Sequence, residues 1–288
     1  MSASFWAEVM GAETRFTDVG GHRTRSVVAG QGAPVILLHG ITGHAETWIR
    51  NIISLSAHHQ VHALDMLGHG LTAKPDISYS VASLGEHVLA YMDAIGAPSA
   101  IIVGQSLGGW VGGWIAVNNA DRVRGYACVT GAGLEVSADA AALTQKIGAK
   151  VASATASATS APTRQSVRAR LEWLMHDASV VTDELVETRY RIYADPAFMA
   201  ISDRMVGELT GAGGGAWTLT RDRLAAIACP ALVLWTRQNP TMPWDVGHEA
   251  SRIIPGATWY LMEDAGHWPQ FEKPAEFNGV LLDFLRRL

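Results

Sequence analysis

The chain has few of the features that define several protein classes. It contains only two cysteines in 288 residues, Cys128 and Cys229, and each falls in an apolar stretch. Two such thiols offer neither a disulfide framework nor the ligand spacing of a zinc site, so we expect both to be free in a reducing cytoplasm. We expect no metal and no cofactor.

Charge and long apolar runs are also scarce. Charged residues make up 17% of the chain, the net charge is −5 and the pI is about 6.1. This balance gives no electrostatic footprint for nucleic acid or an anionic membrane. No apolar run reaches the roughly 18 residues of a membrane helix, and the N-terminus lacks the pattern of a secretion signal. We therefore expect a cytoplasmic protein that acts on a small molecule, without nucleic-acid or membrane partners.

The most informative motif that is present is Gly104-Gln105-Ser106-Leu107-Gly108. An apolar, strand-like run at 100–103 precedes it, and a helix-like run at 110–117 follows it. Strand, G-x-S-x-G and helix in this order form the nucleophile elbow of α/β-hydrolases. There the serine hydroxyl is exposed, and the next amide, that of Leu107, faces the developing oxyanion. The alternative is a glycine-rich turn of another α/β protein.

Two further segments favour the hydrolase interpretation. The apolar run 35–38 ends in His39-Gly40-Ile41, where this fold builds the second half of its oxyanion hole, here from Ile41 beside the substrate-facing Gly40. The apolar run 259–262 leads to His267 in a loop before a closing helix. The order of oxyanion turn, Ser106 and His267 is the order that the fold requires.

Apolar runs alternate with helical patterns along most of the chain. Such alternation predicts a mostly parallel, doubly wound sheet in an α/β-hydrolase fold. The expected strands are 15–19, 24–29, 35–38, 61–65, 100–103, 125–130, 231–235 and 259–262; the expected helices of the core are 46–57, 81–95, 110–117, 244–254 and 274–288.

A helical lid is predicted between 134 and 217, inserted after the sixth strand, because no strand pattern appears there. Helical spacing occurs at 166–175, 182–193 and 197–209, with Thr182 as the expected N-cap. Residues 151–163 are rich in Ala, Ser and Thr and predict a flexible helix or loop, and the glycine run 211–215 a hinge or a linker. We expect residues 1–133 and 218–288 to form the core and the lid to be one structural unit with it.

The chain resembles the meta-cleavage product hydrolases, which cleave a carbon–carbon bond in ring-fission products of aromatic compounds. The resemblance is carried by the elbow and by segments 65–70, 183–190 and 266–272. It implies that Arg189 binds the carboxylate of a dienoate, that Asn51 helps to orient the substrate, and that Trp268 follows the catalytic histidine. Gln105 stands where the family often has asparagine. The resemblance also favours a homodimer.

Each of these three assignments has an alternative. A guanidinium can hold a carboxylate through two parallel hydrogen bonds and fix the substrate under a lid. Arg189 could instead be a solvated helix residue paired with Glu187 or Asp183. Asn51 could lie on a helix surface, and Trp268 could fill the core.

The expected acid of a Ser–His–acid triad is missing from its usual place. After the seventh strand, 231–235, that position falls on Asn239. Asparagine can accept a hydrogen bond from histidine but supplies no negative charge to an imidazolium. Three explanations stay open: another carboxylate (Glu135, Asp245 or Asp264) takes the place, the reaction needs no acid, or catalysis has been lost.

The leading functional hypothesis is hydrolysis of a 2-hydroxy-6-oxo-dienoate by Ser106 and His267, with Asn239 as the third residue. The alternatives are a carboxylesterase or lactonase, a cofactor-free dioxygenase that uses His267 as a base, and a non-catalytic binding protein. The direction of Arg189 discriminates between the first two, since a carboxylate clamp must face the pocket and an ester pocket leaves this arginine in solvent.

Overall fold

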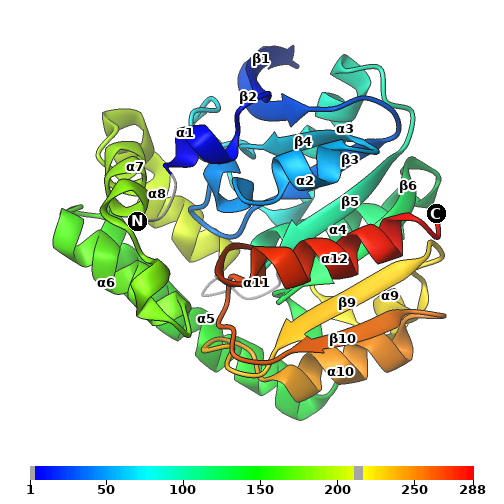
Figure 1. Cartoon of the computed structure of the whole chain (residues 1–288). Coiled ribbons are helices and arrows are strands. Elements are labelled where there is room, and N and C mark those ends of the chain that lie inside the picture. Colours follow the sequence, from blue (N-terminus) through cyan, green and yellow to red (C-terminus); the bar gives the residue numbers. More distant parts are fainter. Residues whose placement is uncertain (1–3, 211–216) are drawn as a thin grey trace.

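The computed structural model describes residues 4–210 and 217–288, and it is built on one central eight-stranded sheet (Figure 1). The strand order is β1-β2-β4-β3-β5-β6-β9-β10. β2 pairs antiparallel with β1 and β4, and every other neighbouring pair is parallel. The predicted sheet is confirmed, with strands β1 Glu13–Val19, β2 His22–Ala29, β3 Pro34–Leu38, β4 Gln60–Leu64, β5 Ala100–Gln105, β6 Val123–Val129, β9 Ala231–Thr236 and β10 Thr258–Met262.

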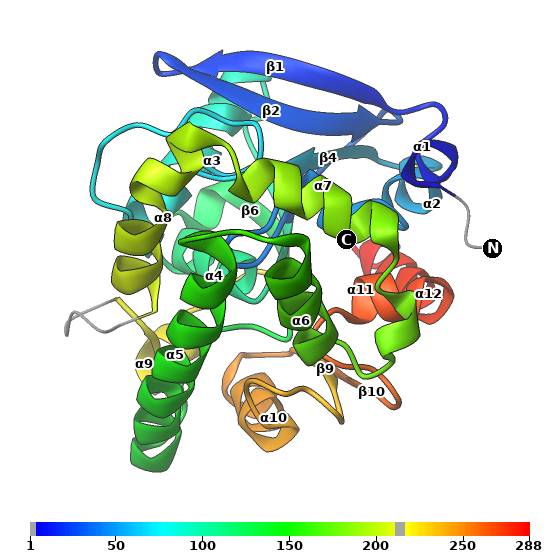
Figure 2. The same ribbon diagram turned by 90° about the vertical axis from the view of Figure 1, so that its left-hand side faces the viewer.

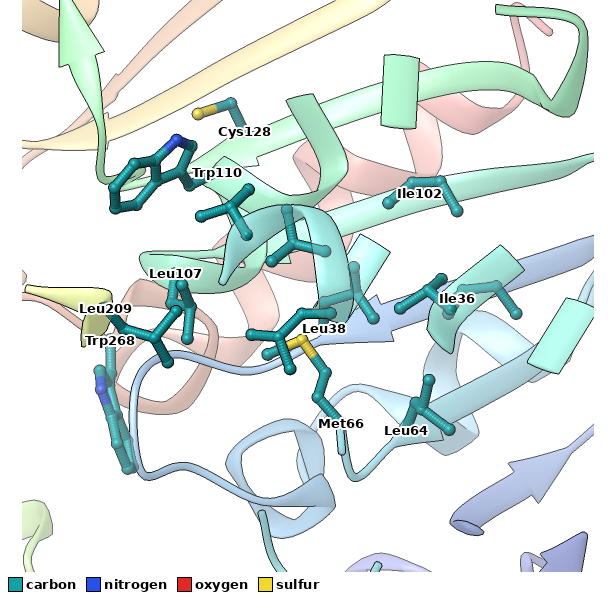
Figure 3. Close-up of a cluster of buried hydrophobic side chains, with 14 of the residues drawn as sticks. Ile36, Leu38, Leu64, Met66, Ile102, Leu107, Trp110, Cys128, Leu209 and Trp268 are labelled. Carbon is teal, nitrogen blue, oxygen red and sulfur yellow. The ribbon is translucent and has the colours of Figure 1, made fainter. Parts of the chain in front are cut away.

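Helices cover both faces of this sheet, because successive side chains of a buried strand point to opposite faces. Ile36 and Leu38 of β3 belong to one apolar cluster, part of which Figure 3 shows, and Val35 and Leu37 belong to the other. The helices outside the lid are α1 Phe5–Glu8, α2 Ile52–Ser56, α3 Val81–Ala94, α4 Leu107–Asn118, α9 Arg221–Ala225, α10 Trp244–Ile253, α11 Pro269–Glu272 and α12 Pro274–Leu285, with 3-10 turns at Ala45–Trp48 and Ala120–Arg122.

The prediction of a single helix at 46–57 is wrong. A 3-10 turn at Ala45–Trp48 and the short helix α2 replace it. The amide of Ala45 donates to the buried carboxylate of Asp65, and the side chain of Asn51 donates to Gln270 O and Asn278 Oδ1. These long-range bonds hold the segment in a broken form that its local pattern does not reveal.

Four helices between residues 138 and 209 lie side by side over one end of the sheet, and we call them the lid helices (Figure 2). Of the helix or loop expected at 151–163, the structure has helix up to Thr159, in the second half of the longest lid helix. The amide of Leu185 donates to Thr182 Oγ1 at 3.2 Å, which confirms the predicted N-cap. The glycine run 211–215 falls outside the described residues. The lid helices are α5 Ala138–Thr159, α6 Arg164–Leu174, α7 Asp183–Tyr193 and α8 Pro196–Leu209, with a 3-10 turn at Ala178–Val180.

Two short strands flank the lid helices, although no strand pattern was found in this region. β7 Leu134–Glu135 and β8 Leu219–Thr220 pair in parallel where the chain leaves and re-enters the core. Two residues are too few to produce a periodic signal. Across the described residues, no helix is long and apolar enough to cross a bilayer.

Ser106 occupies the sharp turn between β5 and α4. Its backbone has φ 55° and ψ −116°, a strained conformation for a residue with a side chain. A Cβ atom at Gly108 would overlap the carbonyl oxygen of Leu38, so α4 can approach β3 only because this position is glycine. The predicted strand–turn–helix context of the motif is therefore present.

Gly108→Ala is expected to lower the free energy of unfolding by about 1–3 kcal/mol, since the added methyl group has no space. Gly207→Ala in α8 is the matched control: nothing lies within 4 Å of its added Cβ, and we expect a gain of about 0.5–1 kcal/mol. Urea unfolding of both variants measures the effects. A Gly108→Ala protein as stable as the wild type would contradict the close approach of α4 to β3.

Candidate active site

A cavity of about 460 Å³ lies between the carboxyl ends of the strands and the lid helices. Loops after parallel strands are where α/β folds place their functional side chains. Most of the predicted site residues line this cavity, namely Gly40, Ile41, Gln105, Ser106, Leu107, Arg189, His267 and Trp268. The region is enclosed further by Leu209 of α8, which lies near Leu107 and Trp268 (Figure 3).

The oxyanion loop and the elbow meet closely around Ser106. Leu107 is the first residue of α4, so its amide has no acceptor within the helix and is free for an oxyanion. A Cβ atom at Gly40 would lie 2.7 Å from Gln105 Oε1 and 3.2 Å from Ser106 Cβ. Glycine at this position lets the backbone that leads to Ile41 approach the serine.

The backbone of His267 is fixed from three sides. Its amide donates to Leu174 O of the lid at 2.7 Å. Its carbonyl oxygen accepts from Gln105 Nε2 at 3.0 Å and from Thr130 Oγ1 at 2.9 Å. Gln105 therefore positions the histidine through its amide nitrogen, while its buried Oε1 has no hydrogen-bond partner and the residue lines the cavity.

Two neutral side chains contact the distal nitrogen of His267. Nδ1 lies 3.0 Å from Asn239 Oδ1 and 3.1 Å from Thr241 Oγ1, and the threonine hydroxyl donates to the same Oδ1 at 2.9 Å. An amide oxygen only accepts, so this arrangement favours the proton on Nδ1 and leaves Nε2 unprotonated. Sequence reasoning missed Thr241, since a threonine two residues past the acid position carries no signal of its own.

In the part of the chain that the structure describes, no carboxylate lies beside Nδ1 of His267. Among the described residues, Glu135, Asp245 and Asp264 make no hydrogen bond to His267; Glu135 lines the cavity elsewhere, and Asp245 accepts from the amide of Val246. Burial, and then the nearby charge of Arg170, lower the pKa of His267 to about 3. The histidine is therefore neutral at pH 7 and a weak base, and nothing beside it stabilises an imidazolium by charge.

Asn239→Asp is expected to raise the pKa of His267, because a carboxylate would then face Nδ1. Neutral histidine is the basic form, so the wild type should keep kcat/KM as the pH falls from 8 to about 5. In the variant the acid limb should move up, towards neutral pH. A pH profile recorded where both proteins are folded measures this. Glu135→Gln tests the alternative acid and should leave both the rate and the limb in place; a large loss of kcat/KM in that variant, with the limb moved to lower pH, would assign the role to Glu135.

Arg189 of α7 is buried, with 2% of its surface exposed, and it faces the cavity. Nη1 donates to Tyr193 Oη at 3.1 Å, and the guanidinium lies over the ring of Trp268, 4.8 Å from its centroid. Nε and Nη2 have no hydrogen-bond partner. The acids considered as surface partners pair elsewhere: Glu187 with Arg164 and Arg191, and Asp183 with Arg168.

Tyr193 connects this arginine to the oxyanion loop. Its hydroxyl lies 2.8 Å from Thr42 Oγ1 and accepts from Arg189, so one phenol joins α7 of the lid to the loop after β3. Both contacts are buried. The guanidinium is thus held at a fixed place beside the predicted oxyanion hole.

Asn51 does not join the other predicted site residues. It is fully buried, but it is not among the residues that line the cavity. Its amide nitrogen donates to Gln270 O and to Asn278 Oδ1, both at 2.9 Å, so the side chain connects the segment before α2 to α11 and α12. The expected substrate contact of Asn51 is therefore not supported, whereas Trp268 both packs in the core against Phe271 and lines the cavity.

The fold and the site together define an α/β-fold hydrolase. A model of the α/β hydrolase fold family matches residues 33–274, and the chain belongs to this family. Within it, the chain resembles the meta-cleavage product hydrolases. It is 29% identical over 278 residues to the 2-hydroxy-6-oxo-6-(2'-aminophenyl)hexa-2,4-dienoic acid hydrolase of Metapseudomonas resinovorans, covering 95% of this chain and 91% of that protein.

Two further comparisons concern a solved structure and a relative with a different name. The solved structure of a serine hydrolase involved in carbazole degradation (CarC) superposes with a TM-score of 0.82 at 27% identity, over 96% of this chain and all of that one. The acetyltransferase component of an acetoin-cleaving system from Cupriavidus necator is 30% identical over 275 residues, 94% of this chain and 68% of that protein.

Proposed function

We propose that this protein hydrolyses the carbon–carbon bond of a 2-hydroxy-6-oxo-dienoate, a carboxylate formed by ring cleavage of an aromatic compound. The observation that carries the proposal is Arg189, a buried guanidinium with two unpartnered nitrogens that lines the same cavity as Ser106 and His267. A buried charge without a counter-ion is costly, and a substrate carboxylate would provide one.

In the proposed reaction, water adds across the C5–C6 bond. The dienol first becomes a ketone, as His267 moves the proton of the 2-hydroxyl group towards C5. The C6 carbonyl is then attacked, either by water directly or by the Ser106 hydroxyl. In the second case an acyl enzyme forms, and water hydrolyses it afterwards. The amides of Ile41 and Leu107 stabilise the oxyanion. Cleavage releases a 2-hydroxy-dienoate and a carboxylic acid, so the atoms of substrate and water are conserved.

The uncharged partners of His267 fit this chemistry better than ester hydrolysis. A proton that travels within the substrate does not require a strongly stabilised imidazolium, whereas a serine esterase benefits from a buried carboxylate at the position of Asn239. Ester or lactone hydrolysis is the second candidate, because the strained elbow at Ser106 suits acyl transfer in general.

The test is turnover of a 2-hydroxy-6-oxo-dienoate compared with that of a neutral nitrophenyl ester. Loss of the dienoate absorbance with formation of the two acids in equal amounts, at a kcat/KM above that for the ester, would support the proposal. Rapid ester turnover without dienoate cleavage would favour the second candidate. Binding of the dienoate without turnover of either compound would indicate a binding protein. Consumption of oxygen would indicate a dioxygenase. A homodimer and a cytoplasmic location stay predictions.

A further inference from the structure

We infer that the cavity holds a second anion-binding position, formed by Arg170, and that the substrate is a dicarboxylate whose second carboxylate lies on the acyl group beyond C6. The inference rests on the proposed function and specifies the substrate class for the same site. Neither the motifs nor the resemblance assigns any role to Arg170.

Arg170 of α6 is buried, with 7% of its surface exposed, and it lines the cavity. Nη2 donates to a neutral acceptor, Thr155 Oγ1, at 3.2 Å, and the guanidinium lies over the ring of Trp173, 4.8 Å from its centroid. Nε and Nη1 are buried without a hydrogen-bond partner. This guanidinium therefore has donors to spare, as that of Arg189 has.

The neighbouring arginines of the lid helices behave differently. Arg164 and Arg191 both pair with Glu187, and Arg168 pairs with Asp183. Glu135 is the one carboxylate among the described residues that line the cavity, and it makes no hydrogen bond to Arg170 or Arg189. Arg170 is charged at neutral pH although burial lowers its pKa to about 10. Two cations thus share a largely desolvated space, which is unfavourable until anions enter.

The two cations serve different parts of the cavity. Arg189 is bound through Tyr193 to the oxyanion loop and lies over the ring of Trp268. Arg170 is bound instead to Thr155 of α5 and lies over the ring of Trp173, and its charge adds to burial in lowering the pKa of His267. The two guanidiniums therefore have different anchors, although they are near enough that the charge of Arg189 adds to burial in lowering the pKa of Arg170.

A substrate with one carboxylate would neutralise one of these charges and leave the other buried. A dienoate that carries a second carboxylate would neutralise both. Hydrolysis at C5–C6 would then give the 2-hydroxy-dienoate at Arg189 and a dicarboxylic acid at Arg170, with one water consumed. Specificity would follow from the unpaired charge that a neutral acyl group leaves behind.

The test uses a 2-hydroxy-6-oxo-dienedioate and its distal monomethyl ester, which differ in the second charge and in one methyl group. For the wild type we expect kcat/KM for the diacid to exceed that for the ester by at least about thirty-fold. Arg170→Met keeps an unbranched apolar stem and should reduce this ratio to near one. Because both compounds use the same His267, a general effect of Arg170→Met on this histidine cancels in the ratio of the two kcat/KM values. Arg168→Met, on the same helix but outside the cavity, should keep the wild-type ratio.

Equal kcat/KM values for diacid and ester in the wild type would overturn the inference, and so would an Arg170→Met protein that keeps the wild-type preference. If neither compound is cleaved, the proposed carbon–carbon hydrolysis is wrong. The second anion-binding position is then tested by calorimetry, which measures the affinity of Ser106→Ala for each compound. Binding of the diacid at least thirty-fold tighter than the ester would still support it, and equal affinities would reject it. The wild-type comparison decides the matter even if Arg170→Met does not fold.

Discussion

Ser106→Ala and His267→Ala should each lower turnover by at least about a thousand-fold, because nucleophile and base act as one unit. The strained elbow presents the Ser106 hydroxyl to the cavity, and Nδ1 of His267 is occupied by Asn239 and Thr241, which leaves Nε2 for proton transfer. A phosphonate probe should label the wild type and fail to label Ser106→Ala. Steady-state kinetics and mass spectrometry measure these effects.

The controls for this pair are Ser157→Ala and His58→Ala, both at exposed positions outside the cavity, which should keep wild-type rates. Wild-type turnover of the dienoate by Ser106→Ala would contradict nucleophilic serine chemistry. With His267→Ala still inactive, that result would instead support direct attack by water, activated by the histidine.

Arg189→Gln should reduce dienoate turnover about 30- to 5,000-fold relative to turnover of a neutral nitrophenyl ester, because it removes a desolvated partner of the substrate carboxylate. The neutral ester has no carboxylate for this contact. Arg191→Gln is the matched control on the same helix: Arg191 is exposed and pairs with Glu187, so the ratio of the two rates should not change.

Thermal unfolding separates this effect from collapse of the lid, since Arg189 also donates to Tyr193. An unchanged melting temperature with a selective loss on the dienoate supports the clamp. Equal losses on both substrates in a folded protein would indicate a general role in shaping the pocket. No loss on either would contradict the assignment.

Local sequence patterns predicted the parts of the fold that depend on local order. Ser106 lies between a buried strand and a helix, and Gly104 and Gly108 permit the close contacts of that turn, so the motif and its context agree. Thr182 was recognised as an N-cap because the cap requires only a side-chain oxygen before a helical pattern. Both features are encoded within a few residues.

Features that depend on distant contacts were not predictable. Asn51 was assigned to the substrate, but its amide joins three segments of the core, and the partners at 270 and 278 are more than 200 residues away. Arg189 and Arg170 have the same side chain as the solvated arginines around them. Only the packing of α6 and α7 over the sheet distinguishes the buried, unpaired guanidiniums from those that meet an acid at the surface.

The most direct test of the central claim is a crystal structure of Ser106→Ala with an intact 2-hydroxy-6-oxo-dienoate in the cavity. We predict that the 2-hydroxy-dienoate carboxylate accepts hydrogen bonds from Nε and Nη2 of Arg189, which lack a partner in the structure described here. The C6 carbonyl oxygen should lie within hydrogen-bonding distance of the amides of Ile41 and Leu107. A carboxylate bound away from Arg189, or a C6 carbonyl that does not reach these amides, would contradict the proposed function.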